Sequence, residues 1–274
     1  MKFLIALERF VAAKFNASTP KRRRSKILKA YAKINVFLKV VGTRGGYHEI
    51  ASRFVLRREL FDEISFERAS GFALECDGAQ IEDNIILKAK AALEQAGFAR
   101  ELAEFFGSHK IVLKKRIPIG AGLGGGSSDA AAFLRLANEE LGLKISRERL
   151  TKIAQNIGAD VAFFVSGLEA ANVRGIGEII EPFEDLLPAI EILTPAIFCS
   201  TGAVYNEFRT SFMQNINAAQ AQEMLRLGSE QLLSQYGGFQ LNDLFAPCIK
   251  LYPQMSKYRD MFLSGSGSSV FFLK

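Results

Sequence analysis

The stretch PIGAGLGGGSSD, residues Pro118–Asp129, decides the fold of this chain. Five glycines fall within the seven residues 120–126, between a predicted strand, His109–Ile117, and a predicted helix, Ser127–Leu141. Glycine loses more conformational freedom on folding than any other residue, so such a run indicates a backbone that must approach a ligand closely. Amides at the start of a helix, together with the positive end of the helix dipole, form an anion site. The stretch therefore predicts a phosphate-binding loop.

Three other interpretations of this loop fit the residues less well. Gly120, Gly122 and Gly125 satisfy the dinucleotide pattern G-x-G-x-x-G, but that match alone is unspecific. The preceding strand, HKIVLKKRIP, is rich in lysine where a Rossmann unit has a buried apolar strand. The Walker A pattern needs a closing Gly-Lys-Ser/Thr, which is absent. A purely structural glycine turn is disfavoured by the five glycines and two serines at a helix start.

The length and composition fit a globular enzyme. A chain of 274 residues forms one large domain or two small ones, and 49% of its residues are hydrophobic. No apolar run reaches the roughly 18 residues that a membrane span needs. Cys76, Cys199 and Cys248 lie far apart in the sequence and form no CxxC, which indicates neither a metal site nor a disulfide framework. We expect a cytoplasmic protein.

The positive net charge of +6 comes from the N-terminus. Residues 1–29 hold nine Lys or Arg and one Glu, so the rest of the chain has a net charge of −2. A nucleic-acid enzyme more often spreads its basic residues along a groove. We expect residues 1–28 to be a peripheral basic leader, with no nucleic-acid partner and no stable membrane association. A signal peptide, a membrane-surface helix and a frayed appendage from an upstream start codon remain alternatives for this segment.

The body of the chain opens with a predicted strand, Lys29–Val41, whose β-branched and aromatic residues favour extended structure. Period-two alternation puts Lys33 and Asn35 on one face, which predicts that this face lines a cleft. The alternative is that both side chains simply face solvent. After Pro182 the pattern changes to short elements, so we expect a domain boundary there.

Further segments accompany the glycine-rich loop in a consistent order. They are KAYAKIN (29–35), GYHE (46–49), IGADV (157–161) and, near the end of the chain, LSGSGSSVF (263–271). Together with PIGAGLGGGSSDA they resemble the GHMP kinases, the superfamily of galactokinase, homoserine kinase and mevalonate kinase. The GLGGGSSDA and Gly-Tyr-His segments favour the branch that phosphorylates a cytidylylated methylerythritol in the non-mevalonate route to isoprenoids. One departure is Ala162, where the family usually has proline after G-A-D-V.

The resemblance implies an α+β fold of two domains. The first, residues 29–183, would resemble a ribosomal-protein fold and bind ATP and the acceptor. The second, residues 184–274, would be a ferredoxin-like α/β domain. The implied reaction moves the γ-phosphoryl group of ATP to the 2-hydroxyl of the acceptor, with Mg²⁺ bound alongside ATP. The oligomeric state stays open between a monomer and a homodimer.

The family's functional residues map onto this sequence one by one. Asp160 is the implied general base, and Lys33 is implied to keep its carboxylate ionised and to offset charge in the transition state. An Asp beside a helix start is, alternatively, an N-cap. Ser127 and Ser128 offer hydroxyls either to phosphate or to Mg²⁺, and no protein ligand of the metal is assigned. The residues implied to bind ATP are Asn84, Pro118, Gly120, Gly122, Leu123, Gly124, Gly125, Gly126, Ser127, Ser128, Gly265 and Gly267.

The acceptor site is implied by a smaller set of residues. They are Asn35, Tyr47, His48, Thr201 and Tyr205. Of Tyr47 and His48, one would stack on the cytosine and the other would read the base edge, and Tyr205 would supply the opposite aromatic face. Two alternatives remain: a GHMP kinase with another acceptor, such as mevalonate or homoserine, and a non-catalytic RNA-binding protein.

Overall fold

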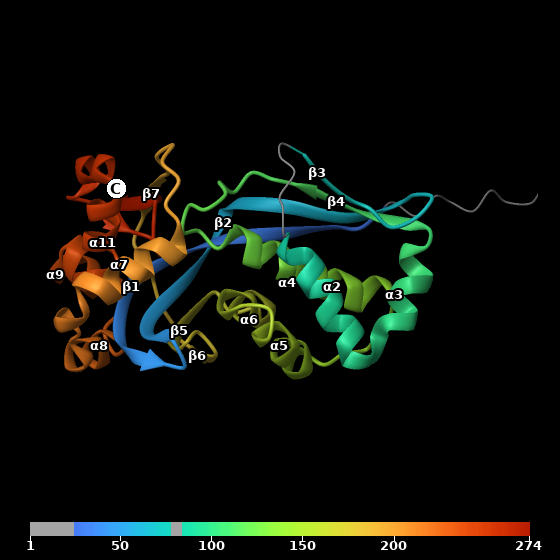
Figure 1. Ribbon diagram of the computed structural model, residues 1–274, viewed down its shortest axis with the longest axis horizontal. Coiled ribbons are helices and arrows are strands. Elements are labelled where there is room, and N and C mark those ends of the chain that lie inside the picture. The colour runs from blue at the N-terminus through green and yellow to red at the C-terminus, as the bar shows by residue number, and fades with distance from the viewer. Residues whose placement is uncertain (1–24, 78–83) are drawn as a thin grey trace, which may run out of the picture.

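The structure, a computed structural model, describes residues 25–77 and 84–274 (Figure 1). Most of the predicted basic leader, residues 1–24, lies outside the described residues. None of the helices in the described ranges is both long and apolar enough to cross a membrane.

Two long antiparallel strands form the spine of the molecule (Figure 1). β1 (Ile27–Arg44) and β2 (Tyr47–Arg68) pair along nearly their whole length. They are joined by Gly45 and Gly46, whose φ angles of +57° and +83° are inexpensive only for glycine. Arg58 and Glu59 are exposed in the middle of the second strand and interrupt its apolar pattern, so the full length of this strand is not apparent from the sequence.

Four shorter strands complete the first sheet. Its strand order is β3-β4-β2-β5-β6, with β1 paired to β2. Besides β1, each half of β2 has its own neighbour: β5 pairs with the first half and β4 with the second half. The bounds of these strands are β3 (Leu74–Asp77), β4 (His109–Lys114), β5 (Ala170–Gly175) and β6 (Ile179–Pro182).

A layer of helices covers one face of this sheet (Figure 1). Their small and aromatic residues form the main core with Phe54, Ile64 and Phe66 of β2. The predicted helix Ser127–Leu141 is confirmed as α4, which starts two residues earlier. The bounds are α2 (Ile85–Leu93), a π-helical turn η1 (Glu94–Phe98), α3 (Ala99–Phe106), α4 (Gly125–Glu140), α5 (Arg147–Gln155) and α6 (Ala159–Ser166). Ala162 is fully buried in α6.

The remainder of the chain forms a second, three-stranded sheet with its own helices. The last strand of the first sheet ends at Pro182. The strands of the second sheet lie in the order β7-β9-β8. The limits 29–183 and 184–274 remain a prediction. The bounds are β7 (Ile190–Leu193), α7 (Thr201–Ser211), η2 (Met213–Asn215), α8 (Ala218–Met224), α9 (Ser229–Gln235), α10 (Gly238–Leu241), α11 (Phe245–Leu251), η3 (Pro253–Tyr258), β8 (Phe262–Leu263) and β9 (Val270–Leu273).

Candidate active site

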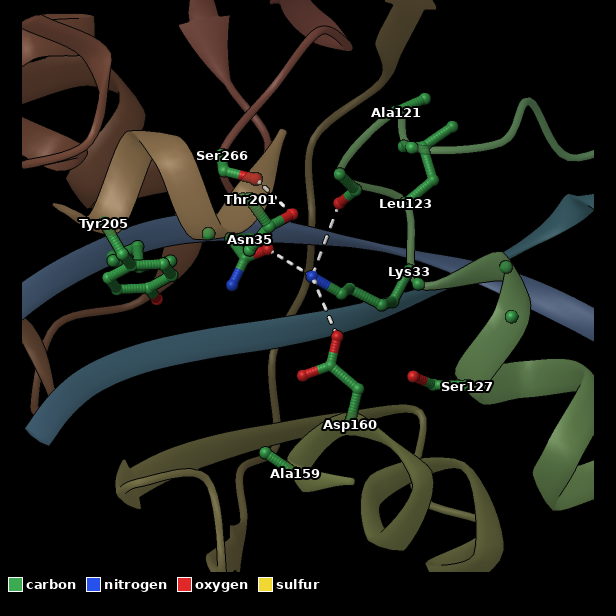
Figure 2. Close-up of a pocket in the computed structure, with 18 of the residues that line it drawn as sticks. Lys33, Asn35, Ala121, Leu123, Ser127, Ala159, Asp160, Thr201, Tyr205 and Ser266 are labelled. Atoms are coloured by element: carbon green, nitrogen blue, oxygen red, sulfur yellow. Dashed lines mark hydrogen bonds and ion pairs between the residues drawn. The ribbon is translucent and has the colours of Figure 1, made fainter. Parts of the chain in front are cut away.

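A pocket of about 780 Å³ lies where β1, the glycine-rich loop, α6, α7 and the β8–β9 loop meet (Figure 2). Every site residue predicted from the sequence lines it except Ser128 and Gly267. Residues from opposite ends of the chain, such as Lys33 and Gly265, therefore face the same space.

The glycine-rich loop is fixed by contacts within the protein as well as being open to a ligand. Gly122 has a φ of +75°, and a Cβ there would collide with the carbonyl oxygen of Ser264. Gly124 has a φ of +70°, and a Cβ there would come within 3.0 Å of the Phe164 ring. Gly126, by contrast, would meet only an ordinary contact at 3.5 Å. The sequence assigned these glycines to ligand approach, but two of them are needed to let the loop pack against its neighbours.

The two serines that begin α4 face different spaces. Ser127 lines the pocket, and its hydroxyl points toward the side where Asp160 lies (Figure 2). Ser128 is 3% exposed and lines a separate cavity of about 120 Å³ on the other side of the helix. This geometry favours Ser127 over Ser128 as a group that touches phosphate.

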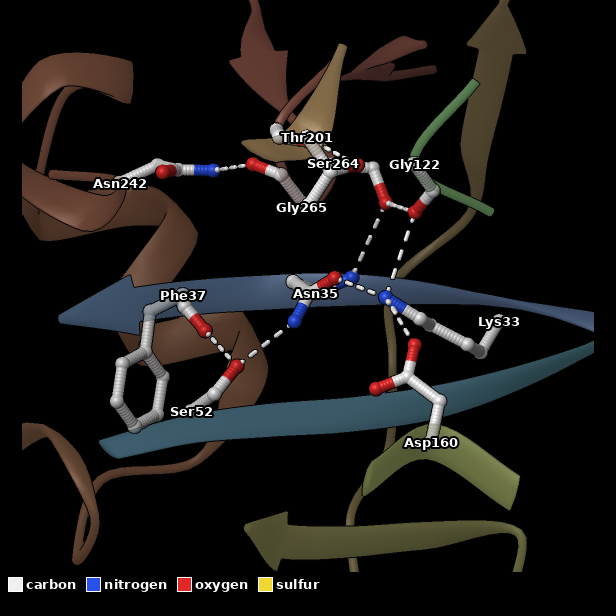
Figure 3. Close-up of polar contacts among 11 residues, drawn as sticks. Lys33, Asn35, Phe37, Ser52, Gly122, Asp160, Thr201, Asn242, Ser264 and Gly265 are labelled. Carbon is white, nitrogen blue, oxygen red and sulfur yellow. Dashed lines mark hydrogen bonds and ion pairs between the residues drawn. The ribbon is translucent and has the colours of Figure 1, made fainter. Parts of the chain in front are cut away.

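Lys33 and Asp160 form an ion pair at the centre of the pocket (Figures 2 and 3). The Lys33 Nζ lies 3.5 Å from Asp160 Oδ2 and 3.4 Å from the carbonyl oxygen of Gly122. The lysine is buried, and burial lowers its pKa while the Asp160 charge opposes that shift. The side chain of Asp160 is 29% exposed, so one face of the carboxylate remains open to a substrate.

The structure argues against a capping role for Asp160. The N-cap of α6 is Gly158, and no side chain caps this helix. Asp160 lies in the first turn, where an acidic side chain interacts favourably with the positive end of the helix. The N-cap alternative raised from the sequence is therefore wrong for this residue.

Asn35 holds the lysine in place (Figure 3). Its Oδ1 accepts a hydrogen bond from Lys33 Nζ, and its Nδ2 donates one to Ser52 Oγ at 2.9 Å. The Asn35 backbone N–H donates to Ser264 Oγ at 3.3 Å. Asn35 is 1% exposed, so its predicted cleft position is buried rather than solvent-facing. Its amide nitrogen carries two N–H groups and, among the described residues, donates only to Ser52, which leaves one N–H for a ligand.

The other end of the pocket is aromatic. The His48 ring packs at 5.1 Å from the Tyr205 ring and edge-on to Phe208. His48 is 8% exposed, and its Nε2 is buried without a hydrogen-bond partner. Burial, followed by the charge of Arg209, lowers the pKa of His48, which favours the neutral imidazole. Tyr47 is 68% exposed, so the geometry favours Tyr47 as the stacking residue and His48 as the edge reader.

The remaining predicted residues have mixed positions. Thr201 Oγ1 lies 2.8 Å from Ser266 Oγ, which joins α7 to the β8–β9 loop. Asn84 caps the N-terminus of α2: its side-chain oxygen accepts a hydrogen bond from the backbone N–H of Ile86 at 3.0 Å. Gly267 lies outside the pocket, where a Cβ would approach Cys248 Sγ at 3.1 Å.

Three charged residues of the pocket were missed from the sequence. Lys115 and Asp129 flank the glycine-rich loop, and Arg209 lies on the pocket face of α7 with Thr201 and Tyr205. Asp129 is the last residue of the glycine-rich segment Pro118–Asp129, so its place in that segment was a signal from which it could have been predicted. Arg209 follows from the four-residue spacing along α7 only once that helix is known to border the site.

Comparison with known proteins gives the class of protein first. Residues 84–168 match the family described as "GHMP kinases N terminal domain". The mevalonate kinase of Methanococcus jannaschii superposes with a TM-score of 0.56 at 13% identity, covering 92% of this chain and 91% of that chain. A likeness at this identity shows the fold alone, and that fold is the predicted α+β arrangement.

More similar relatives narrow the class. A protein of Campylobacter jejuni subsp. doylei named 4-diphosphocytidyl-2-C-methyl-D-erythritol kinase is 46% identical over 252 residues, which are 89% of this chain and 98% of that protein. A protein of the same name from Sulfurimonas denitrificans is 42% identical over 91% of this chain and 97% of its own length. A crystal structure of 4-(cytidine 5'-diphospho)-2C-methyl-D-erythritol kinase superposes with a TM-score of 0.69 at 30% identity, covering 90% of each chain. The chain belongs to the 4-diphosphocytidyl-2-C-methyl-D-erythritol kinase family of GHMP kinases, and the resemblance seen in the sequence is confirmed.

Proposed function

We propose that this chain transfers the γ-phosphoryl group of ATP to the 2-hydroxyl of 4-(cytidine 5'-diphospho)-2-C-methyl-D-erythritol, in isoprenoid precursor biosynthesis. The observation that carries the proposal is the Lys33–Asp160 ion pair, at 3.5 Å, in a pocket that joins a phosphate-type loop to an aromatic end. The names of the similar proteins support the choice of acceptor. We place the reaction in the cytoplasm, with residues 29–183 and 184–274 as the two domains.

Asp160 and Lys33 divide the chemistry between them. The Asp160 carboxylate accepts the proton of the acceptor hydroxyl as that oxygen attacks the γ-phosphorus of ATP. The bond between the γ-phosphorus and the β–γ bridging oxygen breaks, and ADP leaves. The Lys33 ammonium pairs with the Asp160 carboxylate and offsets negative charge on the transferring group.

The phosphates of ATP bind to the N-terminus of α4 in this proposal. The backbone amides of the loop from Gly120 to Ser127, the Ser127 hydroxyl and the amide of Gly265 are the donors, and Asn84 contacts the adenine. Oxygen donors suited to Mg²⁺ are present beside them, because Ser127 lines the pocket and Asp129 Oδ1 is buried without a partner. Held by these donors, the ion would supply positive charge that offsets the charge of the phosphates.

The acceptor occupies the rest of the pocket. The uncommitted amide N–H of Asn35 binds the methylerythritol end close to Asp160. The cytosine stacks on Tyr47, and its edge faces the unpartnered Nε2 of His48. Burial and the charge of Asp160 raise the pKa of Tyr205, so its hydroxyl stays protonated and can donate a hydrogen bond.

A panel of acceptors tests the proposal. ADP release is measured with the cytidylylated methylerythritol, mevalonate and homoserine at equal concentrations. We expect turnover with the first and at least about a hundredfold lower kcat/KM with the others, which leave the base end empty. Equal turnover with mevalonate would show a GHMP kinase of another specificity, and RNA binding without ADP release would show a non-catalytic protein.

A further inference from the structure

One lysine lies between two buried carboxylates at the nucleotide end of the pocket. Lys115 Nζ lies 2.7 Å from Asp129 Oδ2 and also pairs with Asp62. The side chains of Asp62 and Asp129 are 0% and 3% exposed. The proposed phosphoryl transfer gives no role to Lys115 or Asp62, and it names Asp129 only as an oxygen donor suited to Mg²⁺.

The two carboxylates differ in how fully they are satisfied. Both oxygens of Asp62 are occupied: Oδ2 by Lys115 Nζ, and Oδ1 by the backbone N–H groups of Arg116 and Ile117. Asp129 has only its Oδ2 engaged, by Lys115. Its Oδ1 is buried and has no hydrogen-bond partner. An unsatisfied charged oxygen in a protein interior is costly, so a cation bound at this atom would stabilise the ionised carboxylate.

The charges of the cluster do not balance. One ammonium faces two carboxylates, which leaves a net charge of −1 when both are ionised. The ionised form of Asp129 therefore lacks a second cationic partner among the described residues.

The cluster lies directly beside the phosphate-binding amides. Asp129 lines the pocket four residues after Gly125, so both lie on the same side of the first turns of α4. A Cβ on Gly125 would come within 3.4 Å of Lys115 Nζ. A bare carboxylate in this position repels a nucleotide phosphate, whereas a divalent cation between them attracts both.

Mg²⁺ would supply the positive charge that the ionised Asp129 lacks. It prefers oxygen ligands, and in nucleotide sites it is bound through one or two carboxylates together with substrate phosphates and water. No group of three or more His, Cys, Asp or Glu residues suited to a metal is found in residues 25–77 and 84–274.

We propose that Asp129, through its unpartnered Oδ1, is the protein ligand of the Mg²⁺ ion that enters with ATP. Asp62 and Lys115 are positioning residues: Lys115 holds the other carboxylate oxygen, Oδ2, and Asp62 in turn holds Lys115. This proposal rests on the ATP half of the proposed function and is independent of the acceptor.

Asp129→Asn tests the assignment, because it keeps the size of the side chain and an oxygen for Lys115 but removes the charge. Binding of a non-hydrolysable ATP analogue is measured by calorimetry with Mg²⁺ and with EDTA. With Mg²⁺, the variant should bind the analogue at least about tenfold more weakly than wild type, a loss of the size seen when metal sites are perturbed. With EDTA, it should bind as tightly as wild type or more tightly, because the repulsion between carboxylate and phosphate is gone.

Manganese gives a readout that does not depend on activity. Electron paramagnetic resonance measures the affinity of Mn²⁺ for the complex of protein and analogue, and this affinity should fall at least about tenfold in Asp129→Asn. Glu169→Gln is the matched control, since Glu169 is an exposed carboxylate paired with Arg58 and should change nothing. If Asp129→Asn does not fold, Asp129→Ser carries the same two measurements.

The outcomes separate this assignment from the proposed function. An equal loss of affinity with Mg²⁺ and with EDTA, or wild-type Mn²⁺ affinity in the variant, would make Asp129 a structural residue and overturn the proposal. A wild-type protein that binds no ATP analogue at all would overturn the proposed function as well.

Discussion

The two ends of the pocket are built on different principles. The phosphate end consists mainly of backbone: glycines at positive φ pack against the β8–β9 loop, and amides at the start of α4 face the pocket. The base end consists of side chains, with His48 buried, Tyr205 partly buried and Tyr47 largely exposed. A backbone site is fixed once the chain folds, whereas a side-chain site is tuned residue by residue. The first end should therefore tolerate few changes, and the second should respond in a graded and substrate-specific way.

The junction between the two ends should show the largest effect. Asp160→Asn removes the proposed general base while keeping the size of the side chain. We expect kcat to fall by about two to four decades with both KM values nearly unchanged. Steady-state kinetics with each substrate varied in turn checks this. Turnover within about threefold of wild type would exclude Asp160 as the base.

The backbone end is tested by Gly122→Ala. The added methyl group meets the Ser264 carbonyl at a φ of +75°, so we expect a loss of about 2–3 kcal/mol in the free energy of unfolding. Urea denaturation without nucleotide measures it. Gly126→Ala is the matched control, because its Cβ meets only Ile85 at 3.5 Å and alanine favours a helix. Similar stability of the two variants would show that the loop is not held by close packing against Ser264.

The side-chain end is tested by Tyr205→Ala. Loss of an aromatic face beside the base should raise the KM for the cytidylylated acceptor by about one to two decades, since base–aromatic stacking is worth about 1–3 kcal/mol. The KM for ATP should barely move. An ATP-side defect of similar size would remove Tyr205 from the acceptor site.

The smallest effect should be the most specific one. His48→Ala removes a hydrogen bond to the base edge, which is worth about 0.5–1.5 kcal/mol, so the acceptor KM should rise about two- to tenfold. Replacing cytosine by uracil in the acceptor should then harm the wild type far more than the variant. Equal sensitivity of both enzymes to the base would show that His48 does not read it.

The contrast between the backbone-built phosphate end and the side-chain-built base end also explains which features the sequence predicted. The glycine-rich loop and the helix after it were predicted because glycine content and helix starts are local signals. Lys33 and Asp160 are 127 positions apart, and only the resemblance to a family predicted that they lie together. In the structure, Lys33 Nζ lies 3.5 Å from Asp160 Oδ2.

Other features needed the fold itself. Ser127 and Ser128 are indistinguishable in sequence, yet the helix turns one toward the pocket and the other away from it. Lys115, directly after β4, pairs with Asp62 of β2, and no local sequence pattern predicts which charged residues meet in a protein interior. Arg209 could be assigned to the pocket only once α7 was known to border it.

Identification of the product tests the central claim most directly. The protein is incubated with ATP and the cytidylylated methylerythritol, and phosphorus NMR follows every phosphorus atom. We expect one new phosphomonoester on the 2-oxygen of the methylerythritol for each ADP formed, with the cytidine diphosphate intact. ADP accompanied only by inorganic phosphate, or a phosphoryl group on another oxygen, would contradict it.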